Sequence, residues 1–541
     1  MRPVDLINSY YLKYGADEAA CAREYYKNNN SKEINRKIKK LAIYYPIMNR
    51  GGVQRVVSLM LPLYEKMGYE IVLITEVISG DDYNVPESVK RVTVKSVKEI
   101  DGRKFSYRER AQDFEKIFIK EQIDVFIHHG VRLPFFVYDM LLAHCMRIYT
   151  IAEKHQIFTQ GFCDIDDKFY IHKEIFRIID KVIVLSSAEK KYWKYMGIDA
   201  NCIENPYNLS LTDLKCKKNN ENIVWVGRLD INSKQYFDVI EIAKVVVKNK
   251  PGVKFLMYGS GNNSLINELN SIISENKLND NVIFCGYEPD ITRIYLNARI
   301  HLVTSAYEAF PMGIYESRIC GIPLVMYELP YLELLKEKKG FLSSVNGDVS
   351  NMAENICKIL DDKELEERLR IEAKESIKKF SNDLVCEKWE KIFFDIENNH
   401  KEVSENEDVK MIIETMHKHY AIAQKKYEKL LWKSEQEKLI YHVTMKMGEY
   451  GKIVICPYGM VGKKVKKMLN EKEIYETYIV DNTLSKYDST IKSMDEINKM
   501  DCSEVLFVIC SEQEEIKNIF YDSIREIADK EQIIYYDQNI I

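Results

Sequence analysis

Short apolar runs alternate with amphipathic, helix-length stretches through most of this chain, and the alternation narrows the choice of folds. One series of runs lies between residues 39 and 185, and a second begins at residue 222. The strand-like runs span residues 39–46, 70–75, 91–97, 124–128, 147–151, 181–185, 222–227, 253–258, 281–285, 300–303 and 324–327. Strands that alternate with helices form parallel, doubly wound sheets. We therefore predict an α/β fold with two Rossmann-like halves facing a ligand cleft.

The stretch at residues 304–323 places two carboxylates around the start of a predicted helix. Glu308 and Glu316 are separated by seven residues, with the turn 309–313 between them. A strand signal precedes the stretch, and the sequence Gly-Ile-Pro at 321–323 ends the helix before the next strand. Backbone N–H groups at a helix start bind anions and hydroxyls. The segment is either such a site or an ordinary strand-to-helix connection with two solvated glutamates.

Other polar residues follow the carboxyl ends of predicted strands, where ligands of parallel sheets bind. Arg228 and Lys234 follow the first strand of the second half and suit a diphosphate. Gly51 and Gly52 precede a predicted helix, where backbone amides can approach a ligand, although a tight turn also uses glycine. Polar side chains also follow two strands of the first half: His128, His129, Glu153, Lys154 and His155. A histidine so placed is as often structural as catalytic.

The composition describes a globular protein with no overall attraction to polyanions, although local basic patches remain possible. The 541 residues are 46% hydrophobic and 30% charged, and the net charge of −5 gives no general attraction to nucleic acid or anionic lipid. The twelve cysteines include no Cys-x-x-Cys pair and no His/Cys cluster at metal spacing, which favours reduced thiols and the cytoplasm. Neither a signal peptide nor a run of roughly 18–20 apolar residues is evident. We expect at most peripheral contact with the inner face of the cell membrane.

Residues 39–398 resemble the retaining family-4 glycosyltransferases of the GT-B fold. The resemblance rests on the order and spacing of several motifs. They are the GGVQRV loop, the Asn205-Pro206 turn, GRL with a downstream lysine, the YGSG strand end, and SAYEAFPMGIYES followed by CGIP. The resemblance implies transfer of a hexose from a nucleotide diphosphate sugar, expected to be a UDP-sugar, to a glycan, lipid-linked or protein-linked acceptor. Synthesis of a cell-surface polysaccharide or glycoconjugate is the implied setting.

The resemblance also implies roles for individual residues. Glu308 would contact hydroxyls of the donor sugar, and Glu316 would hold the ribose hydroxyls. Arg228 and Lys234 would bind the diphosphate and stabilise the departing nucleotide, and His155 would lie near the reacting carbon. The other residues implied for donor binding are Gly51, Gly52, Gly259, Tyr287, Phe310, Pro311, Met312 and Gly313. Enzymes of this family need no metal and no cofactor, because the two cations and a helix dipole take the charge.

Three positions depart from the family pattern. Ala309 stands where the family usually has glycine, and Ser317 stands where alanine is common. Lys234 lies six residues after Arg228, whereas five is usual. None of these departures removes a charged group, so we still expect activity.

We predict that the chain has six parts: the two halves, the helix that returns to the first half, and three further segments. They are a helical N-terminal extension (1–38), the acceptor half (39–206), the donor half (207–381), a helix returning to the first half (382–400), a helical linker (401–449) and a small Rossmann-like domain (450–541). A polar linker at 215–221 joins the two halves. Apolar residues in the helical linker recur at four- and three-residue spacing from Val409 to Leu430, which suits a short coiled coil or a helix packed on its own chain.

The last domain echoes a dinucleotide fingerprint. Gly459, Gly462 and Asp481 fit its spacing, whereas Pro457 stands in place of the first glycine. Docking is favoured over NAD or nucleotide binding there, and residues 401–541 could join a second copy or a partner glycosyltransferase.

Three other functions stay open at this point. A non-catalytic GT-B subunit is disfavoured, because a degenerate subunit usually loses charges such as those of Glu308, Glu316, Arg228 and Lys234. A nucleotide-sugar epimerase would need no acceptor, so product analysis separates it from a transferase. An NAD-dependent oxidoreductase would change the absorbance of the reduced cofactor. No motif in the chain identifies the nucleotide base, the sugar or the acceptor.

Overall fold

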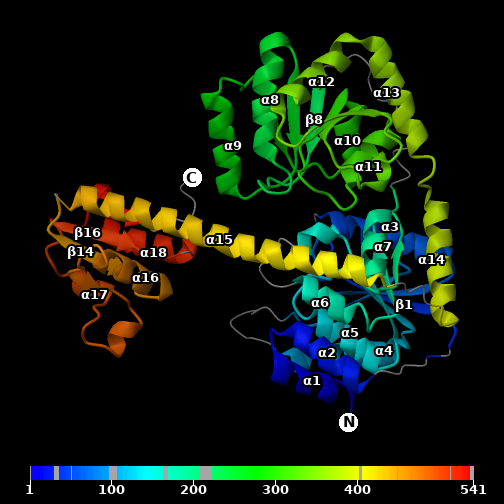
Figure 1. Cartoon of the computed structure of the whole chain (residues 1–541), viewed down its shortest axis with the longest axis horizontal. Helices are drawn as coiled ribbons and strands as arrows, with labels where there is room; N and C mark the ends of the chain where they lie inside the picture. Colours follow the sequence, from blue (N-terminus) through cyan, green and yellow to red (C-terminus); the bar gives the residue numbers. More distant parts are fainter. Residues whose placement is uncertain are drawn as a thin grey trace. The chain divides into compact units, whose positions relative to one another are not determined.

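The computed structural model describes residues 2–29, 34, 36–49, 51–96, 106–161, 168–207, 222–400, 405–447, 449–511 and 513–535. The chain divides into two compact units, Met1–Met416 and His417–Ile541. The first unit contains two parallel sheets and the second contains one, so the predicted α/β fold with Rossmann-like sheets is confirmed (Figure 1). The predicted linker at 215–221 and the end of the predicted strand at 91–97 lie outside the described residues.

The first sheet has seven parallel strands in the order β3-β2-β1-β4-β5-β6-β7. Its strands are β1 (Lys40–Tyr44), β2 (Glu70–Thr75), β3 (Lys90–Thr93), β4 (Val125–His128), β5 (Tyr149–Glu153), β6 (Lys181–Val184) and β7 (Ala200–Cys202). On β1, Ala42 and Tyr44 enter one buried cluster while Leu41 and Ile43 enter another. This two-residue alternation shows that the sheet is buried on both faces, which explains why its strands are continuous apolar runs.

Helices cover both faces of this sheet. They are α1 (Pro3–Tyr14), α2 (Glu18–Asn28), α3 (Gly52–Lys66), α4 (Tyr107–Glu121), α5 (Phe136–Cys145), α6 (Lys168–Ile175) and α7 (Ser187–Tyr195). The N-terminal helices α1 and α2 are part of the core of this half, since Val4, Ile7 and Tyr25 are fully buried within it. The Tyr25 hydroxyl also lies 2.9 Å from Nδ1 of His144 on α5.

The second sheet has six parallel strands in the order β10-β9-β8-β11-β12-β13. Its strands are β8 (Asn222–Val226), β9 (Lys254–Tyr258), β10 (Val282–Gly286), β11 (Ile300–Val303), β12 (Leu324–Tyr327) and β13 (Phe341–Ser344). Its helices are α8 (Tyr236–Asn249), α9 (Asn263–Glu275), α10 (Ile291–Leu296), α11 (Met312–Ile319), α12 (Val349–Asp361) and α13 (Lys363–Ser376). Strand order reverses between β8 and β11, and ligands of open parallel sheets bind at such a switch point.

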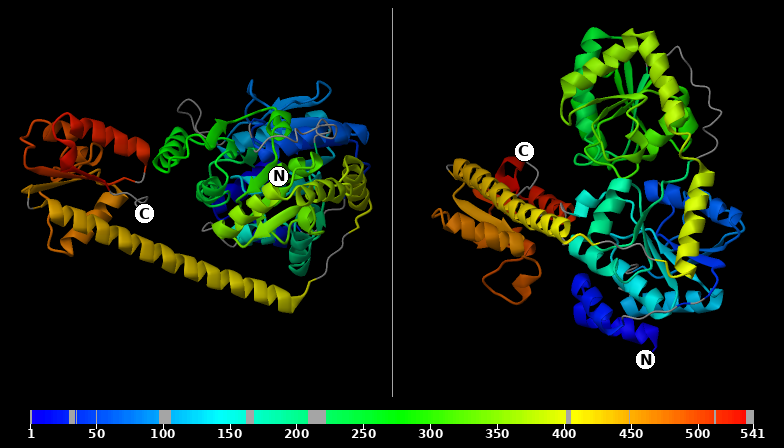
Figure 2. Two further views of the ribbon diagram at one scale, coloured as in Figure 1. Left: turned by 90° about the horizontal axis from the view of Figure 1, so that it is seen from above. Right: turned by 45° about the vertical axis from the view of Figure 1, so that its right-hand side comes forward.

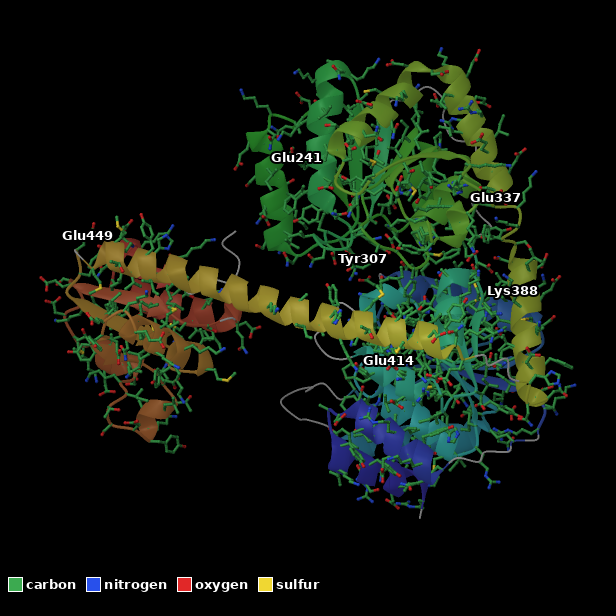
Figure 3. All side chains as sticks on the ribbon, in the orientation of Figure 1. Glu241, Tyr307, Glu337, Lys388, Glu414 and Glu449 are labelled. Carbon is green, nitrogen blue, oxygen red and sulfur yellow. The ribbon has the colours of Figure 1, made fainter. Side chains whose placement is uncertain are left out.

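The helix α14 (Asn382–Glu397) follows the second half of the chain but packs on the first (Figure 1). Its Trp389 is buried against Tyr64 of α3, with ring centroids 5.3 Å apart. Lys388, labelled in Figure 3, forms an ion pair with Glu204 at the end of the first half. The chain therefore crosses between the two halves a second time.

The last described helix of the first unit, α15 (Glu407–Lys446), continues into the second unit as one helix of 40 residues. Near its start, Glu414 pairs with Lys173 at 2.5 Å, within the first unit. On the predicted coiled-coil positions, Met416 is 62% exposed and Tyr420 is 42% exposed. The side chains of Tyr427 and Leu430 lie outside the described residues. The coiled coil stays a prediction.

The second unit has a sheet of four parallel strands in the order β15-β14-β16-β17, drawn in orange and red in Figure 2. Its elements are β14 (Lys452–Cys456), α16 (Met460–Asn470), β15 (Tyr478–Ile479), α17 (Met494–Ile497), β16 (Val505–Ile509), α18 (Glu514–Arg525) and β17 (Ile533–Tyr535). The core of this unit also takes in Leu439 and Val443 at the end of α15. The unit therefore begins before the predicted boundary at residue 450.

Candidate functional site

A cleft of about 1030 Å³ lies where the carboxyl ends of the two sheets of the first unit meet. All thirteen residues to which the resemblance assigns a role line it. They are Gly51, Gly52, His155, Arg228, Lys234, Gly259, Tyr287, Glu308, Phe310, Pro311, Met312, Gly313 and Glu316. Tyr307, which lines the same cleft, is labelled in Figure 3. The structure thus brings together segments from both halves that lie up to 265 positions apart, as from Gly51 to Glu316.

Two helices begin at this cleft without a side-chain cap. The N-cap of α3 is Gly51 and that of α11 is Pro311, and neither residue supplies a side-chain acceptor. Their first-turn N–H groups therefore have no intrahelical partner and carry the positive end of each helix dipole. Because residues of both helix starts line the cleft, opposite walls present amides suited to phosphate or hydroxyl oxygens.

Glu308 lies at the centre of a small polar network in the second half. Its carboxylate forms an ion pair with Lys234, and its Oε1 accepts a hydrogen bond from Ser305 Oγ at 2.7 Å. Its backbone N–H donates to the Tyr331 hydroxyl at 3.0 Å. The carboxylate is therefore held in place before any ligand arrives.

The loop from Arg228 to Lys234 is one residue longer than the family pattern, yet it delivers Lys234 to Glu308. Two hydrogen bonds fix the end of the loop: Thr304 Oγ1 donates to Lys234 O at 2.7 Å, and Ala306 N donates to Ser233 O at 2.9 Å. A turn inside the loop is fixed by Asp230 Oδ1, which accepts a hydrogen bond from Ser233 N at 2.7 Å.

Arg228 is the exposed cation of the cleft. It forms no ion pair with the described residues, whereas Lys234 is committed to Glu308. An arginine in such a position offers five N–H donors to an oxyanion. Arg228 is therefore the more available of the two cations toward an incoming phosphate.

Glu316 lies on α11 with its side chain 1% exposed and faces a cation from the other half. Arg55 Nη2, on α3, lies 2.7 Å from Glu316 Oε1. Burial raises the pKa of Glu316 to about 7. The Arg55 guanidinium and a hydrogen bond from the Tyr295 hydroxyl act in the opposite direction and lower this pKa. Sequence reasoning placed Arg55 in the GGVQRV loop without a role; its position one helical turn after Gly51 was the available signal.

Further contacts join the two walls of the cleft. The hydroxyls of Tyr83 and Tyr287 lie 3.5 Å apart, and Asn205 Nδ2 lies 3.7 Å from Met312 Sδ. Tyr83 was not predicted from the sequence, because nothing near it marks a motif. These contacts and the Arg55–Glu316 pair bridge the halves around the predicted donor site.

The backbone geometry at residue 259 requires a glycine. Its φ is +154°, and a Cβ at this position would lie 1.7 Å from the carbonyl oxygen of Gly227. The ends of β8 and β9 can therefore approach each other only because residue 259 has no side chain. By contrast, a Cβ on Gly52 would meet no atom within 4 Å, so its glycine is not needed for packing.

His155 belongs to a buried group with His129 and Glu153. His155 Nε2 lies 3.0 Å from His129 Nδ1 and 3.5 Å from Glu153 Oε1, and His129 Nδ1 lies 3.5 Å from Glu153 Oε2. Burial raises the pKa of Glu153 to about 8, and burial with the nearby Lys154 charge lowers the pKa of His155 to about 3. Burial also lowers the pKa of His129 well below its ordinary value, so at neutral pH the two imidazoles are uncharged.

His301 is a lining residue that the sequence analysis missed. Its Nδ1 lies 3.0 Å from Ser317 Oγ on α11, and burial lowers its pKa to about 3. It sits inside the strand β11, where an apolar run masked it. Ser317 thus provides a hydrogen-bond partner for this ring.

Of the three dinucleotide-like residues of the second unit, Gly462 and Asp481 have structural partners, whereas a Cβ on Gly459 would meet no atom within 4 Å. A Cβ on Gly462 would lie 2.4 Å from Pro457 O, so this glycine lets α16 approach the end of β14. Asp481 Oδ1 accepts hydrogen bonds from the N–H groups of Thr483 and Leu484, both at 2.9 Å. Each of the two residues is thereby explained by local packing or turn geometry.

Residues 212–376 match the family model described as "Glycosyl transferases group 1". Among curated proteins, a poly(ribitol-phosphate) alpha-N-acetylglucosaminyltransferase of Staphylococcus aureus (strain COL) is 27% identical over 158 residues, which is 29% of this chain and 32% of that protein. A second relative, from Campylobacter jejuni, is 24% identical over 236 residues, which is 42% of this chain and 64% of that protein. It is a GalNAc-alpha-(1->4)-GalNAc-alpha-(1->3)-diNAcBac-PP-undecaprenol alpha-1,4-N-acetyl-D-galactosaminyltransferase. The match thus spans about a third of the first relative's length and under two thirds of the second's.

Solved structures share the fold. The crystal structure of a mutant of S. aureus TarM in complex with fondaparinux, alpha-GlcNAc-glycerol and UDP aligns with a TM-score of 0.55 at 15% identity, covering 66% of this chain and all of that one. Anabaena Alr3699/HepE in complex with UDP and glucose also aligns with a TM-score of 0.55, at 16% identity, covering 65% of this chain and 98% of that one. Residues 212–376 are thus a glycosyl transferases group 1 domain, and the first unit has the GT-B fold.

Proposed function

We propose that this protein is a retaining glycosyltransferase of family 4. It transfers a hexose from a nucleotide diphosphate sugar, with UDP as the carrier, to a glycan, lipid-linked or protein-linked acceptor. The observation that carries the proposal is one cleft in which two uncapped helix starts, Arg228 and the Lys234–Glu308 pair meet.

The charges of the cleft suit the bond that must break. Cleavage of the sugar–phosphate bond develops positive charge on the sugar carbon and negative charge on the diphosphate. Arg228, Lys234 and the first-turn amides of α3 and α11 are fixed partial or full positive charges that favour the separated charges over the ground state. They take the charge that a metal ion would otherwise neutralise, so the transfer needs none.

The two glutamates suit the hydroxyl groups of the donor. In this proposal Glu316, buried on α11, accepts from the ribose hydroxyls, and Glu308 accepts from hydroxyls of the sugar. The remaining lining residues from Phe310 to Gly313 bring the helix start beside the sugar and phosphate. In the retaining reaction the acceptor attacks from the face that the phosphate leaves, and a phosphate oxygen accepts its proton.

The names of similar proteins support the donor and acceptor classes. The TarM and HepE structures contain UDP, and relatives in Campylobacter and Escherichia coli carry undecaprenol-linked acceptors in their names. No described helix combines the length and apolar content of a membrane span. We infer that the enzyme works in the cytoplasm and reaches lipid-linked acceptors by peripheral contact, and that residues 401–541 dock a second copy or a partner glycosyltransferase.

The proposal is tested by the products that the full chain forms from UDP-, GDP- and ADP-sugars in the presence of glycan and lipid-linked acceptors. Release of UDP, together with an α-configured product observed by proton NMR from an α-linked donor, is the expected result. Arg228→Ala should abolish the release, while Arg368→Ala, which removes a 66% exposed arginine on α13, should leave it unchanged. Binding of nucleotides without turnover of any donor would favour the non-catalytic subunit, and a β-configured product would contradict retention.

A further inference from the structure

We propose that His129, Glu153 and His155 bind a divalent transition-metal ion of the Zn²⁺ class in the wall of the cleft. The three side chains offer two imidazole nitrogens and a carboxylate oxygen, all within 4.8 Å of one another. Two histidines and a glutamate are a ligand set that holds zinc in metalloenzymes. The site is distinct from the phosphate-binding groups, which come from α3, α11 and the loop after β8.

The spacing of the donor atoms fits a tetrahedral ion. The two nitrogens are 3.0 Å apart, and each lies 3.5 Å from an oxygen of Glu153. Zinc bonds of about 2.0–2.1 Å imply ligand-to-ligand distances of about 3.3 Å around a tetrahedral ion. The two 3.5 Å distances end on different oxygens of Glu153, so a rotation of this side chain would bring one oxygen close to both nitrogens.

The fold holds the three ligands rigidly. His129 follows β4, Glu153 ends β5, and His128 pairs with Ala152 in the parallel register between these strands. The neighbouring strand ends thus place the residues after them side by side. The three side chains are only 0% to 5% exposed, so little side-chain freedom remains to be lost when an ion binds.

Two polar atoms of the group have no hydrogen-bond partner among the described residues. They are Glu153 Oε2 and His129 Nε2, both fully buried. A buried polar atom without a partner is costly, and an ion bound by Glu153 would satisfy the first of them. An ion bound between the three side chains would explain why two imidazoles and a carboxyl group are buried together.

The surroundings admit an ion and favour a soft one. His155 lines the cleft, so a fourth ligand position can face solvent or a bound molecule. The neighbouring Lys154 is paired with Glu189 at 2.7 Å, and this partner offsets part of the lysine charge that a bound cation would face. Imidazole ligands suit zinc and its transition-metal neighbours, whereas Mg²⁺ and Ca²⁺ take oxygen ligands.

Ion binding would compete with catalysis, a consequence that rests on the proposed function. A His155 ring whose Nε2 ligates an ion cannot turn that nitrogen to the reacting sugar. Zn²⁺ should therefore inhibit transfer without taking part in the chemistry. The binding itself is independent of whether the protein is a transferase.

The test is the visible spectrum of the metal-free full chain titrated with Co²⁺. We expect one Co²⁺ per chain with the intense visible bands of a tetrahedral nitrogen–oxygen site, displaced by Zn²⁺ and unaffected by excess Mg²⁺. His129→Gln and Glu153→Gln should weaken binding more than about tenfold. His442→Gln, which removes an exposed histidine of α15, should leave the spectrum unchanged.

The wild-type titration alone can overturn the proposal, so it does not depend on the variants folding. Absence of the visible bands, or bands with the strong near-ultraviolet absorption of cysteine–cobalt bonds, would show that this group is not the site. Undiminished binding in both correctly folded variants would do the same, and would leave the group as a hydrogen-bonded support for His155. Stoichiometric Co²⁺ binding with no sugar transfer would uphold the metal site while removing the proposed function.

Discussion

Arg55, on a helix of the first sheet, and Glu316, on a helix of the second, form an ion pair of 2.7 Å across the cleft. The carboxylate that is proposed to hold the ribose thus already has a cationic partner from the opposite wall. A nucleotide must share or replace this contact, so donor binding is linked to the contact between the two halves.

Removal of Arg55 should destabilise the protein more than removal of both partners. At pH 8.5, where Glu316 is ionised, Arg55→Ala leaves a buried carboxylate without its cation, at a cost of about 3 kcal/mol. The double variant Arg55→Ala/Glu316→Gln removes that charge and should recover much of the loss. Thermal unfolding of the wild type, both single variants and the double variant measures this coupling. Equal and additive losses would show that the ion pair contributes nothing.

Nucleotide affinity should rise with pH through the titration of Glu316. Only the carboxylate can accept hydrogen bonds from both ribose hydroxyls, and the pKa of Glu316 is raised to about 7. Affinity should therefore increase by about tenfold between pH 6 and pH 8. Isothermal titration calorimetry of Glu316→Gln should show weaker binding with no such rise. A wild-type profile as flat as that of the variant would remove Glu316 from ribose recognition.

The same raised pKa should lower the stability of the fold as the pH rises, whereas nucleotide affinity should increase. Because the folded-state pKa lies above that of the unfolded chain, the protonated carboxyl of Glu316 favours folding. This contribution is fully present below about pH 4.5, the ordinary pKa of the carboxyl, and is lost as the pH rises through about 7. A comparison of the unfolding temperatures of the wild type and Glu316→Gln at pH 6 and pH 8 should therefore show the variant gaining relative stability at the higher pH. An unchanged difference between the two proteins would show that Glu316 does not titrate in this range.

Substitution of Arg228 should reduce turnover more than it weakens binding of the donor. The guanidinium meets the charge that develops on the leaving diphosphate, so Arg228→Ala should lower kcat by about 100- to 1000-fold with a smaller change in KM. Arg368→Ala is the matched control because it removes an exposed arginine outside the cleft. An Arg228 variant that changes only KM would indicate that Arg228 binds the donor equally in the ground and transition states.

Two glycines of the cleft should respond differently to alanine. Gly259→Ala should lower the unfolding temperature sharply, because its Cβ would overlap the Gly227 carbonyl and its φ is +154°. Gly52→Ala should leave the unfolding temperature unchanged, because its Cβ meets no atom, yet weaken a diphosphate-bearing ligand that approaches the α3 amides. Thermal unfolding and calorimetry separate the two effects. Full ligand affinity in Gly52→Ala would exclude a close approach at α3.

The sequence alone predicts the architecture of the first unit and thirteen of the residues that line its cleft. Alternating strand and helix signals carry the fold, and Glu308 and Glu316 share one contiguous motif. The Arg55–Glu316 pair could not be predicted, because it joins residues 261 positions apart through the packing of two halves. The His129–Glu153–His155 group likewise depends on strand pairing. His129 lies 24 residues before Glu153 in the chain, and only the pairing of β4 with β5 brings it beside Glu153 and His155.

The start of the second unit could not be located correctly from the sequence. The predicted boundary at residue 450 followed the restart of the strand and helix pattern at β14. Leu439 and Val443 belong to the same core, but they lie on a helix that continues without a break from Glu407. Helical periodicity identifies α15 but cannot tell which part of the chain covers its apolar side chains.

The central claim is that the cleft binds a nucleotide diphosphate sugar through Glu316. It is tested most directly by calorimetric titration of UDP and UDP-sugars into the wild type, Glu316→Gln and Glu241→Gln at pH 8. Glu241, labelled in Figure 3, is an exposed glutamate of α8 paired only with Lys244 among the described residues, which makes it a matched control. We predict saturable one-to-one binding that Glu316→Gln weakens and Glu241→Gln preserves. Binding that is absent from the wild type, or equal in all three proteins, would contradict the account.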